Sequence, residues 1–332
     1  MVRSSLLLLV FAVLGRLHAA ETAGVDGRSR PGPTAGPMAY HGWTGALRLR
    51  NEQVEVIVVP EVGRVMSFRF HDGQNVLWED VSLRGKRGDP TGREWVNFGG
   101  DKTWPAPEAE WKTHTKREKW MPPPGFDGMP GRARREGTAI VLTSTADPFY
   151  GIRTSRRITL RGDDPIMVIE TEYEKVSGAA MPVGIWVITQ FRDPVAVYLP
   201  VPAASRFPDG HFRFRDTPWP QLTTVDGLLK VTRDPAASHK LGSDADRMLW
   251  VGAKEMCLVA MTRVAGAEYP DRGASVEVYT NPDPKTYVEL ETLGPLAALG
   301  PGQRIQETNT YTLLRRRETN AEADARRILG RQ

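Results

Sequence analysis

The residues best suited to chemistry lie in one short stretch of the chain, from Trp95 to Pro107. This stretch combines two tryptophans, an adjacent glycine pair, an acid and a base, and Trp111, His114 and Trp120 follow it closely. Indole faces beside charged groups suit a ligand with apolar C–H faces and many hydroxyls, which describes a sugar. Glycines let backbone approach a ligand closely, and prolines fix an extended path. The stretch therefore predicts a saccharide site; the alternative is a structural loop whose tryptophans plug one end of a sheet.

Asp101 and Lys102 are the adjacent acid and base of this stretch. As an exposed ion pair at the end of a loop they would contribute roughly 0–1 kcal/mol to stability. Between Trp95 and Trp104 they would instead hold sugar hydroxyls or a substrate carboxylate, and desolvation would lower the pKa of Lys102 toward acid–base use. We favour contact of both residues with a ligand, and we expect Trp104 and Trp111 to stack on the sugar.

Apolar periodicity predicts that β-strands position these residues. From about residue 40 onward, alternating or continuous apolar runs are separated by Gly, Pro, Asn and Asp turns, and only residues 321–329 form an amphipathic helical pattern. Residues 79–137 lack this periodicity and should be rich in loops, and so long an irregular insert is usually functional. About fifteen strands without helical crossovers predict an all-β fold, a large and mostly antiparallel sandwich. We predict one domain over residues 40–316, followed by a helical tail over residues 317–332.

The N-terminal residues predict export from the cytoplasm. Arg3 precedes an apolar run at residues 6–14, and Ala19 and Ala20 follow that run. This is the pattern of a secretory signal peptide over residues 1–20, and the run is too short to be a membrane span. Glycines and prolines then predict a flexible lead-in over residues 21–39. We expect a periplasmic or extracellular protein without a membrane span.

Composition and missing motifs exclude several classes of function. The net charge is only +4, from 44 basic and 40 acidic residues, and the basic clusters are scattered, so we expect no nucleic-acid partner. A single cysteine, Cys257, excludes an intramolecular disulfide. The sequence has no P-loop, no dinucleotide fingerprint, no nucleophilic serine elbow and no metal-ligand spacing, so we expect no cofactor and no metal.

Several segments together resemble the galactose mutarotase-like supersandwich, and in particular a secreted bacterial family related to aldose 1-epimerases. Residues 60–68 with the strand after them resemble the Gly-Gly-Arg-Ile opening of mutarotase-like proteins, and residues 97–100 fall where mutarotases carry a His-Gly-Gly turn. Residues 183–191 resemble the strand that bears their second histidine. Residues 288–293, with the Pro-Gly turn that follows, resemble their closing Leu-Glu-Thr strand. The resemblance spans most of the chain after the signal peptide and implies the supersandwich fold.

The resemblance also implies roles for single residues. Mutarotases open a hexose ring with a carboxylate base and a histidine acid. Glu291 matches the carboxylate, Phe98 (or Asn97, if the register slips by one) replaces the first histidine, and Gln190 replaces the second. Arg64 matches a position near the sugar, although a surface arginine is an equal alternative. Phenylalanine and glutamine cannot donate a proton near neutral pH, so the resemblance implies a sugar-binding cleft without the ring-opening chemistry of the family.

Two alternatives stay open for the remaining site residues. Alternation puts Glu289 and Glu291 on one face of a strand, which is either a cleft or plain solvent surface, and Trp186 belongs to the core or to the floor of the cleft. We predict a carbohydrate-binding protein; the alternative is a sugar epimerase, isomerase or polysaccharide-cleaving enzyme, and a third option is a structural envelope protein. The candidate catalytic residues are Glu291 and Lys102. The candidate substrate-binding residues are Arg64, Asn97, Asp101, Trp104, Trp111, Trp186 and Gln190.

Overall fold

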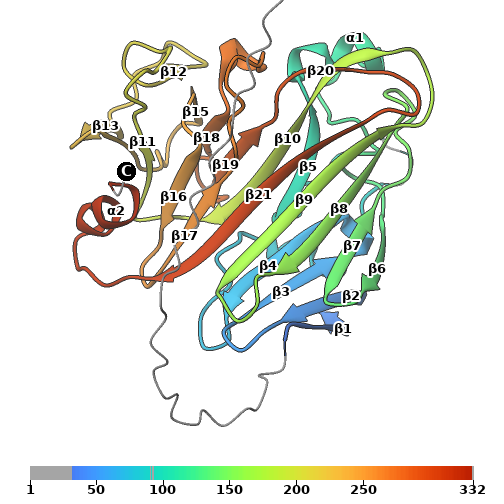
Figure 1. The fold of residues 1–332 in the computed structure, drawn as a ribbon, viewed down its shortest axis with the longest axis horizontal. Coiled ribbons are helices and arrows are strands. Elements are labelled where there is room, and N and C mark those ends of the chain that lie inside the picture. The colour runs from blue at the N-terminus through green and yellow to red at the C-terminus, as the bar shows by residue number, and fades with distance from the viewer. Residues whose placement is uncertain (1–31, 90, 92, 331–332) are drawn as a thin grey trace, which may run out of the picture. The chain divides into compact units, whose positions relative to one another are not determined.

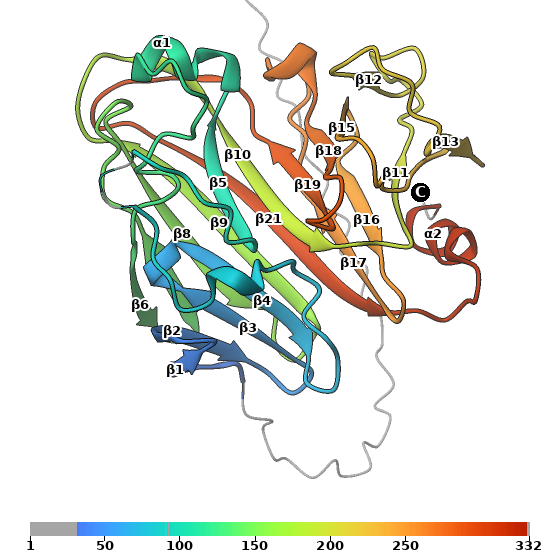
Figure 2. The same cartoon turned by 180° about the vertical axis from the view of Figure 1, so that it is seen from behind.

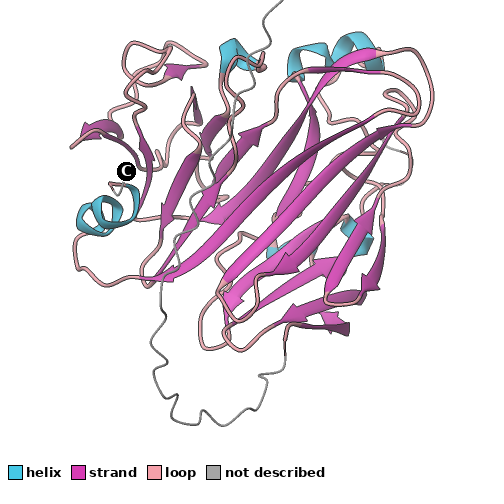
Figure 3. Cartoon of the chain, in the orientation of Figure 1, coloured by secondary structure: helices cyan, strands magenta, loops and turns pink. Residues whose placement is uncertain are grey.

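The computed structural model describes residues 32–89, 91 and 93–330. The predicted signal peptide and residues 21–31 of the predicted lead-in lie outside the described residues. Strands dominate the described part of the chain, and they form two large antiparallel sheets that pack face to face (Figures 1 and 3). The predicted all-β, mostly antiparallel sandwich is therefore confirmed. No helix among the described residues is both long and apolar enough to cross a membrane.

The first sheet contains eleven strands and carries most of the residues discussed below. Its order is β1 (Thr34–Tyr40), β2 (Trp43–Arg50), β3 (Val54–Val59), β4 (Arg64–Phe70), β5 (Asp101–Ala106), β10 (Met181–Arg192), β19 (Tyr287–Leu293), β18 (Val276–Thr280), β15 (His239–Ser243) and β12 (Phe212–Arg213), with β20 (Ala297–Leu299) paired to β10.

The second sheet contains ten strands and covers one face of the first (Figure 2). Its order is β13 (Leu222–Val225), β14 (Leu228–Val231), β11 (Ala196–Pro200), β16 (Arg247–Val251), β17 (Glu255–Ala260), β21 (Arg304–Arg315), β9 (Ile166–Lys175), β8 (Ile152–Leu160), β7 (Ala139–Thr143) and β6 (Arg132–Glu136). The described residues thus hold 21 strands, more than the expected number, because very short strands such as β12 and β20 leave no periodic pattern.

The main core lies between the two sheets, and β3 shows how the sequence builds it. Val54, Val56 and Val58 point into this core, together with Phe68 of β4 and Leu313 of β21. Ile57 and Val59, on the alternate face of β3, are also buried, because they pack into a second cluster that contains Trp43 and Phe98. A continuous apolar run is what a strand covered on both faces requires.

Strand β5 lies inside the stretch that we expected to be loop-rich, and it corrects that expectation. The sequence of β5 does not alternate, and Pro105 interrupts it, so no strand pattern is visible. Proline is tolerated at an open edge, and β5 pairs with β4 only at the Val65–Asp101 position, which leaves most of that side of β5 free of a neighbour. Gly99 has a φ of 93°, and a Cβ there would lie 2.2 Å from the Trp78 carbonyl oxygen, so this glycine permits contact with the protein's own backbone.

The two ends of the described chain differ in how well the sequence predicts them. β1 begins at Thr34, within the expected lead-in, and it pairs with β2 at the edge of the sheet, where its Pro37 is tolerated. The helix α2 (Ala321–Leu329) lies where the amphipathic pattern predicts it, with the Asn320 side chain accepting a hydrogen bond from the Glu322 amide as N-cap. Its apolar face packs on β11, β16 and β17 of the second sheet. The described residues also form a short helix, α1 (Trp111–Thr115), and four 3-10 turns (Pro60–Val62, Val81–Leu83, Glu108–Glu110 and Asp271–Gly273).

Candidate functional site

A pocket of about 710 Å³ opens on the face of the first sheet that points away from the second sheet. Strands β5, β10, β19, β18 and β15 form its floor, in that order across the sheet. Its lining residues are Trp95, Trp104, Glu108, Trp120, Trp186, Phe214, Arg215, Ser238, His239, Lys240, Tyr279, Asn281, Tyr287, Glu289 and Glu291. The pocket thus combines indole, carboxylate, phenol and amine groups.

Strand register brings these groups together from distant parts of the chain. Gln190 of β10 lies opposite Glu289 of β19, Glu289 lies opposite Tyr279 of β18, and Tyr279 lies opposite Lys240 of β15. Side chains at directly opposed positions point to the same face of a sheet. One row of polar side chains therefore crosses four strands of the pocket floor.

A second row lies two residues along each strand. It contains Lys102 of β5, Ile188 of β10, Glu291 of β19 and Glu277 of β18. Because strand side chains alternate, Glu289 and Glu291 share the pocket face, as the sequence pattern predicts. The two carboxylates are about 7 Å apart along β19.

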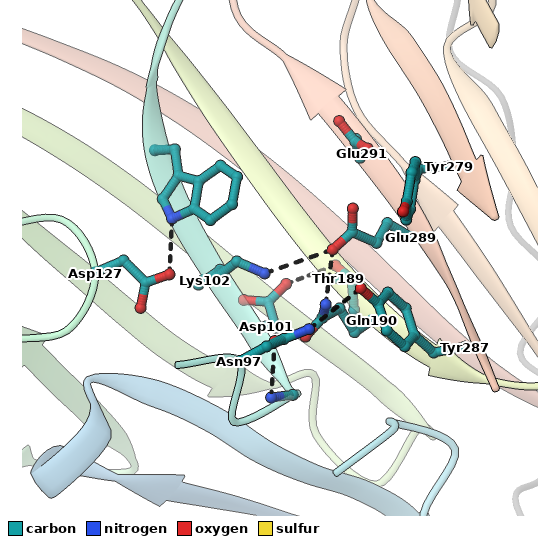
Figure 4. Close-up of polar contacts among 12 residues, drawn as sticks. Asn97, Asp101, Lys102, Asp127, Thr189, Gln190, Tyr279, Tyr287, Glu289 and Glu291 are labelled. Atoms are coloured by element: carbon teal, nitrogen blue, oxygen red, sulfur yellow. Dashed lines mark hydrogen bonds and ion pairs between the residues drawn. The ribbon is translucent and has the colours of Figure 1, made fainter. Parts of the chain in front are cut away.

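Trp95, Trp104 and Trp120 form one wall of the pocket, and Asp127 orients two of them. The Trp95 and Trp104 indole nitrogens each donate to Asp127 Oδ2 at 2.9 Å. Asp127 is labelled in Figure 4. Arg64 Nη2 donates to the other Asp127 oxygen at 2.5 Å. Trp120 packs edge-on against Trp95 and Trp104, at centroid distances of 5.5 and 6.0 Å. Asp127 and Arg64 thus hold the indoles without facing the pocket.

Lys240 joins two buried carboxylates at the pocket floor. Its Nζ lies 2.9 Å from Glu291 Oε2 and 2.6 Å from Glu277 Oε2, although the latter pair is not aligned as a hydrogen bond. The Trp186 indole nitrogen also donates to Glu291 Oε2, at 2.7 Å. Burial alone would lower the pKa of Lys240, but Glu277 and Glu291 together raise it above its ordinary value. Lys240 is therefore charged, and it holds Glu291 in place.

Glu289 has a different environment two residues away. Gln190 Nε2 donates to Glu289 Oε1 at 2.7 Å, and Lys102 Nζ lies 3.7 Å from the same oxygen (Figure 4). Burial raises the pKa of Glu289, the Lys102 charge opposes that shift, and Glu291 adds to it. Burial also lowers the pKa of Lys102, an effect that Glu289 opposes. Glu289 therefore holds a proton more readily than an ordinary glutamate, and burial raises the pKa of Glu277 in the same direction.

The structure places the predicted site residues in three groups. Trp104, Trp186 and Glu291 line the pocket. A second group lies behind the lining: Lys102, Gln190, Asn97 and Arg64. Lys102 and Gln190 contact Glu289. Asn97 Nδ2 donates to the Tyr287 hydroxyl at 3.3 Å, and Arg64 donates to Asp127, which holds the indoles. Trp111 packs behind Trp104, and its indole nitrogen donates to the Pro105 carbonyl at 2.7 Å.

Asp101 faces the opposite side of the sheet, which corrects the expectation that it shares a hollow with Lys102. It is fully buried between the sheets, where it pairs with Arg156 and accepts hydrogen bonds from Thr189 Oγ1 at 2.6 Å and the Tyr311 hydroxyl at 2.8 Å. The reason is the alternation of β5, since consecutive residues of a strand point to opposite faces. The interpretation of residues 95–107 as a loop does not include this alternation, so it places Asp101 and Lys102 on the same side.

Several pocket residues escape the sequence analysis. Lys240 and His239 lie in a short strand whose sequence, His-Lys-Leu-Gly-Ser, has little apolar signal. His239 stacks on Trp219, and its Nε2 lies 3.0 Å from Asp234 Oδ2. Tyr279 could have been predicted as a site residue, because side chains alternate along the predicted strand and Tyr279 therefore shares a face with Glu277. Among the described residues, no group of three or more His, Cys, Asp and Glu side chains is arranged to hold a metal ion.

Comparison with solved structures assigns the class of fold. A galactose mutarotase-like protein from Lactobacillus casei shares 11% identity and a TM-score of 0.54, over 81% of this chain and 100% of that one. A "putative aldose 1-epimerase" from Escherichia coli shares 12% identity and a TM-score of 0.54, over 86% and 100% of the two chains. The Slr1438 protein of Synechocystis shares 14% identity and a TM-score of 0.56, over 83% and 96%. The predicted galactose mutarotase-like supersandwich is thus confirmed.

Comparison of sequences assigns the family. The profile of the family described as "Domain of unknown function (DUF4380)" matches residues 45–314, so the chain belongs to that family. No curated protein sequence matches the chain.

Proposed function

We propose that this protein binds a carbohydrate in the pocket on the open face of its first sheet. The observation that carries the proposal is the combination of an indole wall with carboxylates and phenols in one pocket of about 710 Å³. Indole faces pack on the C–H faces of a pyranose, while carboxylate and phenol oxygens accept or donate hydrogen bonds to its hydroxyls. The likeness to mutarotase-like structures supports a role of this kind.

The positions that match the family histidines argue against ring opening by the family mechanism. Phe98 is buried and packs against Trp43. Gln190 is buried and its amide is bound to Glu289. Neither side chain can protonate a ring oxygen near neutral pH. His239 does line the pocket, but one of its ring nitrogens is held by Asp234.

The binding proposal is tested by a thermal-shift screen with a panel of saccharides, followed by calorimetric titration of each hit. A ligand at 100 times its Kd stabilises the folded state by about 2.7 kcal/mol, which the screen detects easily. Trp186→Phe removes the indole at the pocket floor, and Trp250→Phe is the matched control, because Trp250 is buried in the main core away from the pocket. Loss of the shift in the first variant and its retention in the second supports the proposal. Equal shifts in both variants contradict it.

We further propose that the protein acts outside the cytoplasm. The basis is the sequence of residues 1–20, with its basic start, apolar run and small residues. The test is cell fractionation of the full chain and of a chain that begins at residue 21. Export of the first alone supports this proposal, and cytoplasmic retention of both contradicts it.

A second candidate function is acid–base catalysis on a sugar, and the contrast between Glu289 and Glu291 favours it. Two carboxyls in different environments are the usual basis for one acid and one base. Glu289, with its raised pKa, would donate a proton, and Glu291, held by Lys240 and Trp186, would accept one. Lys102 would not contact the sugar; its charge would oppose the rise in the pKa of Glu289. Anomer-exchange and reducing-end assays test this: turnover that Glu289→Gln abolishes supports it, and turnover that this variant leaves intact contradicts it.

A further inference from the structure

We propose that the ligand of this pocket is an oligosaccharide of at least two linked rings rather than a monosaccharide. The inference rests on the proposed carbohydrate-binding function and adds to it the size class of the ligand. Three features of the pocket carry it: its width, the exposed aromatic side chains on its rim, and the spacing of the polar groups between them.

The pocket is wider than a single sugar ring. The strands that supply its floor run from β5 to β15, which is four strand spacings, or about 19 Å between the axes of the two outer strands at ~4.8 Å per spacing. A six-membered ring with bonds of ~1.5 Å measures about 6 Å between opposite hydroxyl oxygens. The volume of about 710 Å³ also lies within the range of pockets that bury ligands larger than one monosaccharide. One ring would leave most of the floor in contact with water.

Two exposed aromatic side chains stand on the rim of the pocket. Trp120 is 50% exposed and Phe214 is 38% exposed, and both line the pocket. They belong to a small set of large apolar side chains exposed to this degree among the described residues. Because both rings line the pocket, they offer apolar surface to a ligand in it.

These rim residues are held in defined orientations. The Trp120 indole nitrogen donates to Glu108 Oε1 at 2.7 Å, and its ring edge packs against Trp95. Phe214 packs against Phe212 at a centroid distance of 4.9 Å, and Lys240 Nζ lies 4.9 Å from its ring. A preorganised ring offers stacking surface at low entropic cost. Trp120 and Phe214 are therefore platforms for sugar rings beyond the one that contacts the floor.

Polar groups continue along the floor between these platforms. Glu289 of β19 and Tyr279 of β18 lie on adjacent strands, so their oxygens can meet hydroxyls at a spacing of about 4.8 Å. Glu108 lies beside Trp120, and Arg215 follows Phe214, at the two ends of the pocket. Hydrogen-bonding groups thus extend beyond the reach of a single ring.

The test is calorimetric titration with saccharide ladders of one to four rings, built from glucose, mannose, galactose, xylose and galacturonic acid. For the ladder that binds, we expect the trisaccharide to bind about tenfold more tightly than the monosaccharide, because each added stacking contact contributes a few-fold in affinity. Trp120→Ala and Phe214→Ala should remove this gain, so that the trisaccharide binds no more tightly than the monosaccharide to either variant. Phe149→Ala is the matched control, since Phe149 is 37% exposed and lies outside the pocket lining.

The outcomes separate this inference from the proposed function. Equal affinity for one ring and for three rings overturns the inference while the binding function stands. A gain with length that survives in both rim variants also overturns it. Failure of every ladder to bind the wild-type protein overturns both proposals. Unchanged unfolding midpoints of the rim variants show that any loss of affinity is local.

Discussion

The two faces of the first sheet carry polar residues in different ways, although consecutive residues of the same strands supply both. Asp101 of β5 and Thr189 of β10 face the second sheet, in a closed network with Arg156 and Tyr311 whose carboxylate is fully satisfied. On the open face, Lys102 Nζ has no hydrogen-bond partner among the described residues, and neither does Gln190 Oε1. A satisfied buried network fixes structure, whereas these two atoms lie behind the pocket lining without a hydrogen-bond partner in the described part of the chain.

The largest expected effect breaks the closed network. Asp101→Ala leaves Arg156 buried without its counter-ion, which should cost about 3–5 kcal/mol in the free energy of unfolding. Chemical denaturation measures this loss. Lys102→Met is the matched control on the open face, and it should change stability by only about 1 kcal/mol, because Glu289 keeps the hydrogen bond from Gln190 and its raised pKa lets it take up a proton. Equal costs for the two variants would remove the distinction between the faces.

Glu307 extends the comparison between satisfied and unsatisfied buried polar groups, because no cation is among the causes of its pKa shift. Burial raises the pKa of Glu307 on β21 to about 7. Because the folded-state pKa lies above the unfolded value, this group disfavours the folded state increasingly as pH rises from about 4.5 to 7. Glu307→Gln should therefore stabilise the protein by up to about 3 kcal/mol at pH 8 and have little effect near pH 4. Denaturation at both pH values tests this, and a pH-independent difference would contradict it.

The orientation of the indole wall provides the next prediction. Asp127→Ala removes the acceptor of two indole nitrogens and leaves Arg64 without its carboxylate. We expect a loss of about 2–3 kcal/mol in stability and weaker saccharide binding, because Trp95 and Trp104 lose their fixed orientation. Calorimetry on the folded variant at low temperature measures the affinity. Unchanged affinity would show that the wall does not contact the ligand.

The smallest expected effect on stability concerns Glu289→Gln. This substitution keeps the size of the side chain and leaves Gln190 with an oxygen acceptor. Stability should change by about 1 kcal/mol or less, because the pKa of Glu289 is already raised toward the neutral form by burial. Saccharide affinity should fall about tenfold, because an amide replaces the carboxyl group that bonds a ligand hydroxyl. A large loss of stability with unchanged affinity would place Glu289 with the structural residues.

The sequence predicts the fold better than it predicts the site. Local periodicity and turn residues specify most strands, the C-terminal helix and the shared face of Glu289 and Glu291. The position of Asp101 could not be predicted, because Pro105 and the lack of alternation hide β5. Lys240 escaped because pairing between strands far apart in sequence depends on the packing of both sheets, which no local pattern contains. The site is thus a property of register across five strands.

A crystal structure of the protein with the tightest-binding saccharide of the ladder screen tests the central claim most directly. The account predicts a pyranose ring on the open face of the first sheet, stacked on the tryptophan wall, with hydroxyls bonded to Glu289 or Glu291. A saccharide bound elsewhere on the surface, with this pocket filled by solvent alone, would contradict it.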